Sequence, residues 1–267
     1  MVSETGGNQS VERASAVLNA FTLGRPALRV SDVAKEIGLG LSITSRLLST
    51  LESAQLVRRD PVSQLYELGS AVLTLAGVAL NNDPVYRQSR TVAQRLAWEL
   101  GLGANVAVLR GDHLFYLLNV EGHLAQKSFS LMGQRNPLHA TGIGKCLLLG
   151  LTAEQRKELL GEGPFTAYTT RTLTELHVLE EDLATTVARG YATEVEELAL
   201  SRACVAAPVR DHTGQVVAAL SLSGALSAIA LEKREAELGS IVIEAADAIS
   251  IGLGYLGPVH TPAKPQK

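Results

Sequence analysis

Apolar residues recur every three or four positions between residues 31 and 57, which is the period of an α-helix. We expect Ser31 to cap a first short helix and Gly38 to end it. Gly40 allows a sharp reversal, and Ser42 is expected to cap a second helix. The predicted core stripes are Val33, Ala34 and Ile37 in the first helix and Ile43, Leu47, Leu48 and Leu51 in the second. This arrangement is a helix-turn-helix pattern.

The second of these helices leaves hydroxyl side chains and one arginine outside its apolar stripe. A recognition helix presents such groups to base edges in the major groove of DNA. Two helices separated by glycine also occur in the cores of ordinary domains, and this alternative is about as plausible on the pattern alone. The residues that follow decide between the two interpretations.

Residues 56–59 and 64–68 predict two short strands joined by a turn at residues 60–63. A two-stranded wing directly after a helix-turn-helix is a much more specific signal than the helices alone. Its arginines are placed to meet phosphate or a minor groove. The candidate DNA contacts are Ser42, Thr44, Ser45, Arg46, Ser49, Arg58 and Arg59.

Beyond the wing, an apolar run at residues 71–80 predicts a helix that connects two domains. Its surface is too apolar to remain in water, so we expect it to contact a second subunit. The rest of the chain alternates strands and helices in an order that predicts an antiparallel sheet covered by helices, an α+β fold. The expected strands are residues 104–109, 113–120, 126–132, 191–196, 204–210 and 215–223, and the expected helices are residues 84–100, 142–151, 152–160, 174–189 and 231–253.

Length and composition agree with two globular domains, each with a hydrophobic core. The chain has 267 residues, 46% of them hydrophobic, and a formal net charge of −3. Residues 1–70 hold seven basic and seven acidic side chains, which is evidence against DNA binding unless the cations share one face. The two cysteines have no metal-ligand spacing, no secretory segment precedes the first domain, and no apolar run reaches the ~20 residues that span a bilayer. We therefore expect a cytoplasmic protein with no metal and no cofactor.

Residues 137–146 are the most informative stretch of the second domain for chemistry. Two glycines follow Thr141 at a helix start, where free amide groups attract a carboxylate or a phosphate. A glycine-assisted helix start without any ligand is the alternative. Ser221 and Ser223 share one face of a strand, which suits a polar ligand pocket. We expect the acidic residues Glu194, Glu196 and Glu197 to form a turn in water, unless Glu194 points inward.

An enzymatic interpretation would place a catalytic group at His139 or Cys204. The sequence offers neither residue a local partner, so each is more readily explained as structural, and we expect no catalytic residue. Another alternative is a DNA-binding protein whose second domain only oligomerises. Turnover of a candidate carboxylate in a screen would favour the enzyme. The absence of any response to small molecules would favour the protein whose second domain only oligomerises.

Several motifs in order resemble the IclR family of transcriptional regulators. They are the winged helix-turn-helix, Pro137 to Lys145, Arg189 to Ala192, Cys204 to Val209 and Ser221 to Gly224, and the resemblance covers about residues 9–255. It implies a winged helix-turn-helix domain at residues 8–70, a linker helix at 71–82 and a GAF-like effector domain at 83–256. The three prolines of residues 257–267 predict a disordered tail.

The resemblance also implies a function. Family members bind palindromic operators as dimers or tetramers and respond to small metabolites, often carboxylates or aromatic acids; a repressor is expected. By position, the effector-binding residues are Leu131, Met132, Gly142, Ile143, Glu194, Cys204, Ser221 and Ser223. Two departures stand out: Glu194 replaces the aspartate of some members and leaves less room, and residues 41–44 lack the lysine of the commoner Pro-Lys-Ser-Thr.

Overall fold

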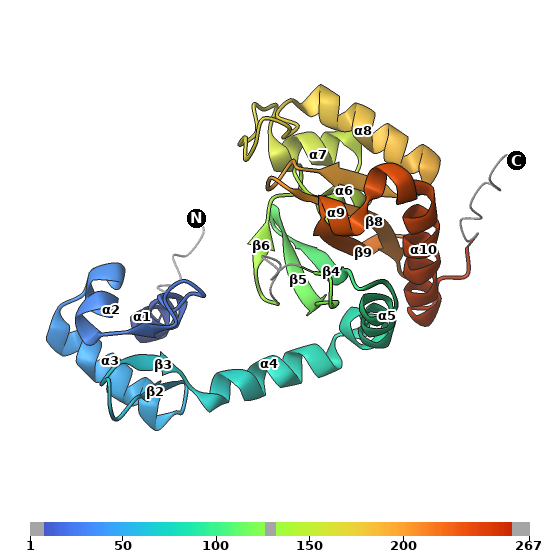
Figure 1. Cartoon of the computed structure of the whole chain (residues 1–267). Coiled ribbons are helices and arrows are strands. Elements are labelled where there is room, and N and C mark those ends of the chain that lie inside the picture. Colours follow the sequence, from blue (N-terminus) through green and yellow to red (C-terminus); the bar gives the residue numbers. More distant parts are fainter. Residues whose placement is uncertain (1–7, 126–131, 258–267) are drawn as a thin grey trace, which may run out of the picture. The chain divides into compact units, whose positions relative to one another are not determined.

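The computed structural model describes residues 8–125 and 132–257. The chain divides into two compact units, residues 1–82 and 83–267, and each is described by itself (Figure 1). Among the described residues, no helix is long and apolar enough to cross a membrane.

The first unit is a small helical bundle with a three-stranded antiparallel sheet. The sheet order is β1-β3-β2, so the two wing strands are neighbours. Its core combines all three helices of the bundle with the wing and includes Val17, Phe21, Leu28, Val33, Leu48, Leu51, Val57 and Tyr66. The elements are α1 (Gln9–Asn19), β1 (Ala27–Leu28), α2 (Val30–Ile37), α3 (Leu41–Ser53), β2 (Val57–Arg59), β3 (Tyr66–Leu68) and α4 (Ser70–Asn82). The predicted winged helix-turn-helix is confirmed.

Both predicted helix caps in this unit are wrong, whereas the predicted helix end is right. The α2 helix begins at Val30, and the Asp32 carboxylate accepts a hydrogen bond of 3.0 Å from the Arg29 amide, so Ser31 lies inside the helix. The α3 helix begins at Leu41 and has Gly40, not Ser42, as its N-cap. Gly38 ends α2 with a left-handed φ of 67°.

The α4 helix has no buried residue in the isolated chain. Leu73, Leu75 and Val78 are all exposed, and Leu73 is 76% exposed. An apolar helix surface of this kind is the signature of an interaction site rather than of a solvated helix.

The second unit is built on a six-stranded antiparallel sheet of order β6-β5-β4-β9-β8-β7. The α+β fold class is therefore confirmed, although the short elements β6 and α9 were not expected. Of the predicted strand at residues 126–132, residues 126–131 lie outside the described residues, and Met132 lies in a turn. The elements are α5 (Pro84–Leu100), β4 (Gly103–Arg110), β5 (His113–Val120), β6 (Arg135–Asn136), α6 (Gly142–Leu148), α7 (Ala153–Leu160), α8 (Leu176–Arg189), β7 (Ala192–Val195), β8 (Arg202–Arg210), β9 (Val216–Ala225), α9 (Leu226–Ile229) and α10 (Leu231–Gly252).

Helices cover both faces of this sheet. The α5 and α10 helices contact each other, and α10 runs across β8 and β9 (Figure 1). The α6 helix packs on the face that carries Ala206 and Ala219, which join Ile143 and Leu147 in one core cluster. Because strand side chains alternate, Val205 and Leu220 point to the opposite face, and both are fully buried. The sheet is thus the middle layer of the unit.

Candidate functional site

The sheet face beneath α6 changes from apolar to polar along its central strands. Its apolar end is made by small residues and joins the core through Ala107, Ala192, Ala206 and Ala219. At positions two residues away from these alanines, towards the other end of the sheet, the same face carries the polar side chains of Asn105, Glu194, Cys204 and Ser221. Ser223 lies on this face two residues beyond Ser221 on β9. Strand pairing brings these groups together, since Asn105 pairs with Ser221 and Cys204 pairs with both Glu194 and Ser223. The polar end of the face is therefore a single continuous patch.

A cavity of about 290 Å³ lies over this patch. Its volume is at the lower end of the range for small-molecule sites, roughly 300–1,000 Å³. It is lined by Asn105, Tyr116, Asn136, Thr141, Ile143, Glu194, Leu198, Ala199, Arg202, Ala203, Cys204, Ser221 and Ser223. Five of the eight predicted effector-binding residues are among them: Ile143, Glu194, Cys204, Ser221 and Ser223. We call this cavity the pocket.

Hydrogen bonds orient the hydroxyl groups of the pocket. The Asn105 side-chain amide donates to Ser223 Oγ at 3.1 Å and to Ser221 Oγ at 3.4 Å, while its oxygen accepts from Asn119 at 2.6 Å. Because both serine oxygens accept a hydrogen bond, each hydroxyl retains its own proton for donation. Among the described residues, none accepts a hydrogen bond from these hydroxyls, so both protons are free to point into the pocket.

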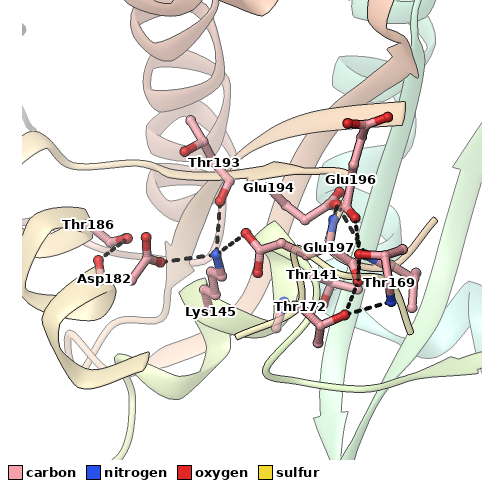
Figure 2. A network of polar contacts seen from close by, with 12 residues as sticks. Thr141, Lys145, Thr169, Thr172, Asp182, Thr186, Thr193, Glu194, Glu196 and Glu197 are labelled. Atoms are coloured by element: carbon pink, nitrogen blue, oxygen red, sulfur yellow. Dashed lines mark hydrogen bonds and ion pairs between the residues drawn. The ribbon is translucent and has the colours of Figure 1, made fainter. Parts of the chain in front are cut away.

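Glu194 points inward, and the prediction of an acidic turn in water is wrong for Glu194 and Glu197, which are both buried. The Glu194 carboxylate accepts hydrogen bonds from the amides of Glu197 at 2.6 Å and Leu198 at 3.3 Å (Figure 2). Burial raises the pKa of Glu194, and these amides and the Lys145 charge oppose the rise. The pocket thus contains a buried carboxyl group that two backbone amides hold in place.

Three predicted effector-binding residues are not lining residues of the pocket. Gly142 lies against β8, where a Cβ atom would come within 2.8 Å of the Cys204 sulfur, so close packing explains this glycine. Met132 is 47% exposed and lies outside the pocket lining. Leu131 lies outside the described residues.

Sequence reasoning missed Asn105, Tyr116, Asn136 and Arg202. Asn105 carried a usable signal, because it is the one polar side chain in the apolar run of residues 104–109. A polar residue inside a buried strand needs a hydrogen-bond partner, and its partners are the two serines. Arg202 gave no such signal, since its position at the pocket depends on the pairing of β8 with β7 and β9.

The residues of the enzymatic alternative occupy structural positions. Burial and the nearby Glu194 charge raise the pKa of the Cys204 thiol well above its usual range, which disfavours the reactive thiolate. The His139 ring lies 3.0 Å from the Thr166 carbonyl oxygen and 5.1 Å from the Phe165 ring, and burial lowers its pKa. In the described part of the chain, no group of three or more metal-ligating side chains is present.

In the first unit, the predicted core stripe of α3 is correct at Leu47, Leu48 and Leu51 but wrong at the start of the helix. Thr44 is fully buried and donates a hydrogen bond to the Gly40 carbonyl at 3.1 Å, so the prediction that it contacts DNA is wrong. Ile43, expected in the core, is 43% exposed. The predicted contacts Ser42, Ser45, Arg46 and Ser49 are all exposed. Among the described residues, no acidic side chain forms an ion pair with the exposed Arg46.

The wing arginines Arg58 and Arg59 are exposed, but both contact other residues of the wing. Arg58 forms an ion pair with Glu67 on the neighbouring strand. Arg59 lies over the Tyr66 ring at 5.5 Å and donates to the Gln64 carbonyl at 3.3 Å. These contacts hold both guanidinium groups along the wing and reduce the free charge of Arg58.

The fold and these two surfaces define a class of protein: a DNA-binding transcriptional regulator with a separate effector domain. Residues 10–61 match the IclR helix-turn-helix domain, and residues 77–251 match the bacterial transcriptional regulator IclR C-terminal domain. The chain belongs to the IclR family, whose members regulate transcription and are not enzymes.

Relatives of the chain match it over nearly their full length. The HTH-type transcriptional regulator XynR of Escherichia coli is 32% identical over 250 residues, which cover 92% of this chain and 98% of XynR. The HTH-type transcriptional repressor AllR of Salmonella typhimurium is 31% identical over 253 residues, 95% and 93% of the two chains. The structure of an IclR homologue from Microbacterium hydrocarbonoxydans in complex with 4-hydroxybenzoate is 25% identical, with a TM-score of 0.81, and covers 91% of this chain and 98% of the homologue.

Proposed function

We propose that this chain is a repressor that binds a palindromic operator as a dimer or tetramer and senses a small organic acid. The observation that carries the proposal is the pocket, which brings hydroxyl donors, an arginine and a carboxyl group to one cavity in a chain that also has a DNA-binding unit. A relative whose printed name is transcriptional repressor, AllR, supports the sign of regulation. The protein would act in the cytoplasm, where its operator lies.

The chemistry of the pocket favours a carboxylate ligand. Ser221 and Ser223 hold hydroxyl protons that a carboxylate oxygen would accept, and Arg202 adds a positive charge to the lining. The Glu194 carboxyl group lines the same cavity and would accept a hydrogen bond from a ligand hydroxyl. The homologue that binds 4-hydroxybenzoate, a ligand with both groups, supports this ligand class.

The exposed face of α3 would read the operator. Arg46 and the serines Ser42, Ser45 and Ser49 present donors and acceptors to base edges, and Arg58 and Arg59 would contact the phosphate backbone or the minor groove. The exposed side chains Leu41 and Ile43 can contact thymine methyl groups, which sequence reasoning did not anticipate.

The proposal is tested by selecting the operator from a random DNA library with the full-length protein and then adding 4-hydroxybenzoate and other small organic acids. A palindromic consensus whose complex dissociates on addition of one acid would support the proposal. DNA binding that responds to no acid would favour a second domain that only oligomerises, and turnover of an acid, measured by mass spectrometry, would favour an enzyme.

A further inference from the structure

One wall of the pocket is a turn at residues 196–201, which we call the wall turn. Leu198 and Ala199 from this turn line the pocket. Two of its residues, Glu196 at φ 58° and Ser201 at φ 62°, adopt the left-handed region although neither is glycine. Such a backbone costs conformational free energy and persists only where surrounding contacts impose it. The wall turn therefore depends on what holds it.

Polar contacts fix the wall turn from the connection between α7 and α8 (Figure 2). Thr169 donates its hydroxyl to the Glu196 carbonyl at 2.5 Å, and Thr172 donates to the Glu197 carbonyl at 2.6 Å. The Glu196 carboxylate accepts from the Ser201 amide at 2.8 Å, which closes the turn on itself. These bonds restrain the backbone of the wall turn but do not connect it to α6.

The side chain of Glu197 makes that connection. It is buried and accepts a hydrogen bond of 2.6 Å from Lys145 Nζ on α6. Lys145 is 1% exposed, and its ammonium group also lies 3.2 Å from the Thr193 carbonyl oxygen and 3.1 Å from an Asp182 carboxylate oxygen (Figure 2). One buried cation thus joins α6, α8, the strand β7 and the wall turn.

We propose that Lys145 is a positioning residue of the pocket: through Glu197 it fixes the wall turn, and with it the amides that hold Glu194. Lys145 itself is not a lining residue of the pocket, so it acts on a bound molecule only through these groups. The effect on the wall turn stands on the contacts alone, whereas an effect on ligand affinity rests on the proposed function.

The direct test removes the connection without leaving a lone buried charge. In Glu197→Met, Lys145 keeps its contacts with Asp182 and Thr193, so the variant should fold. In Glu197→Gln, the amide oxygen can still accept from Lys145. The control is Arg156→Met. It removes the ion pair between Arg156 on α7 and Glu180 on α8, whose atoms lie 2.7 Å apart, and neither residue lines the pocket.

The first readout is amide hydrogen exchange, resolved by residue, in the ligand-free protein. We expect the amides of Glu197 and Leu198, which donate to Glu194, to exchange at least about tenfold faster in Glu197→Met, because exchange follows local opening. Amides in β8 should be unchanged. Glu197→Gln should restore most of the protection, and Arg156→Met should leave these two amides as in the wild type.

The second readout is affinity for 4-hydroxybenzoate by calorimetry. A loss of about tenfold in Glu197→Met, with recovery in Glu197→Gln and no loss in Arg156→Met, is expected. If the wild type does not bind the probe while the exchange pattern holds, 4-hydroxybenzoate is not a ligand of this chain and the positioning role stands. Unchanged exchange in Glu197→Met, or equal changes in Glu197→Met and Arg156→Met, would overturn the positioning role.

Discussion

Arg46 is the residue on which sequence-specific DNA binding should depend most. It lies on the exposed face of α3, and no described carboxylate pairs with it, in contrast to Arg58. We expect Arg46→Ala to cost about 1–3 kcal/mol of operator affinity and to relax discrimination at one position of each half-site. A shift assay with operator variants measures both effects, and Lys233→Ala, an exposed cation on α10, is the control. Unchanged operator affinity in Arg46→Ala would show that α3 does not read bases.

Glu197 makes the stability of the second unit depend on pH. Burial raises the pKa of Glu197 from 4.5 to about 7. The Lys145 charge opposes this rise, whereas the Glu194 and Asp182 charges add to it. The folded state therefore binds this proton more tightly than the unfolded state, so the contribution of Glu197 to stability falls as pH rises from about 4.5 to about 7. Relative to Glu197→Gln, the wild type should lose stability over this interval in denaturant unfolding. Parallel pH profiles of the two proteins would contradict the assignment.

At the scale of elements, the wing carries an arginine for DNA, Arg58, together with an acidic residue, Glu67, that pairs with it. Glu67 on β3 pairs with Arg58 on β2 and neutralises part of its charge. We expect Glu67→Ala to strengthen binding to all DNA sequences alike and to steepen the salt dependence, because it frees one cation for phosphate. Titrations at several salt concentrations test this, with Glu36→Ala, which frees Arg25 on another part of the unit, as the comparison. Weaker binding in Glu67→Ala would mean that the ion pair positions Arg58 for contact.

Most elements followed from the periodicity of the chain, whereas the N-caps of α2 and α3 did not. The apolar stripe placed α3 correctly but assigned Ile43 to the core in place of Thr44, since a threonine can bury its methyl group while its hydroxyl bonds to the Gly40 carbonyl. The cap of α2 is supplied by Asp32 from inside the helix, which a search for a preceding serine cannot find.

The pocket was predicted in part for a similar reason. Strand alternation grouped Ser221 with Ser223, whereas the contribution of Asn105 required the pairing of β4 with β9, more than 100 residues apart in the chain. The partners of Lys145 could not be predicted, because Asp182 and Glu197 are distant in sequence and meet it only in the folded unit. Long-range pairing is what local sequence patterns do not encode.

At the scale of the whole molecule, the α4 helix exposes an apolar surface that includes Leu73, Leu75 and Val78. We expect α4 to join two subunits, so that two α3 helices meet successive major grooves about one helical turn or a small multiple apart. Leu75→Glu, a substitution on its exposed apolar surface, should shift the protein towards monomers and weaken operator binding. Light scattering at micromolar concentration tests this, and a stable wild-type monomer would exclude the arrangement.

We propose that a small acid in the pocket controls operator binding by the first unit. Operator affinity should be measured with and without the identified acid, in the wild type and in Ser221→Ala combined with Ser223→Ala. We expect the acid to weaken operator binding of the wild type about 5–150-fold, the usual range of such coupling, and to have little effect on the double variant. The two ligand-free proteins should bind the operator equally well. An undiminished response to the acid in the double variant, or loss of its operator binding without ligand, would show that these serines do not link the acid to DNA binding.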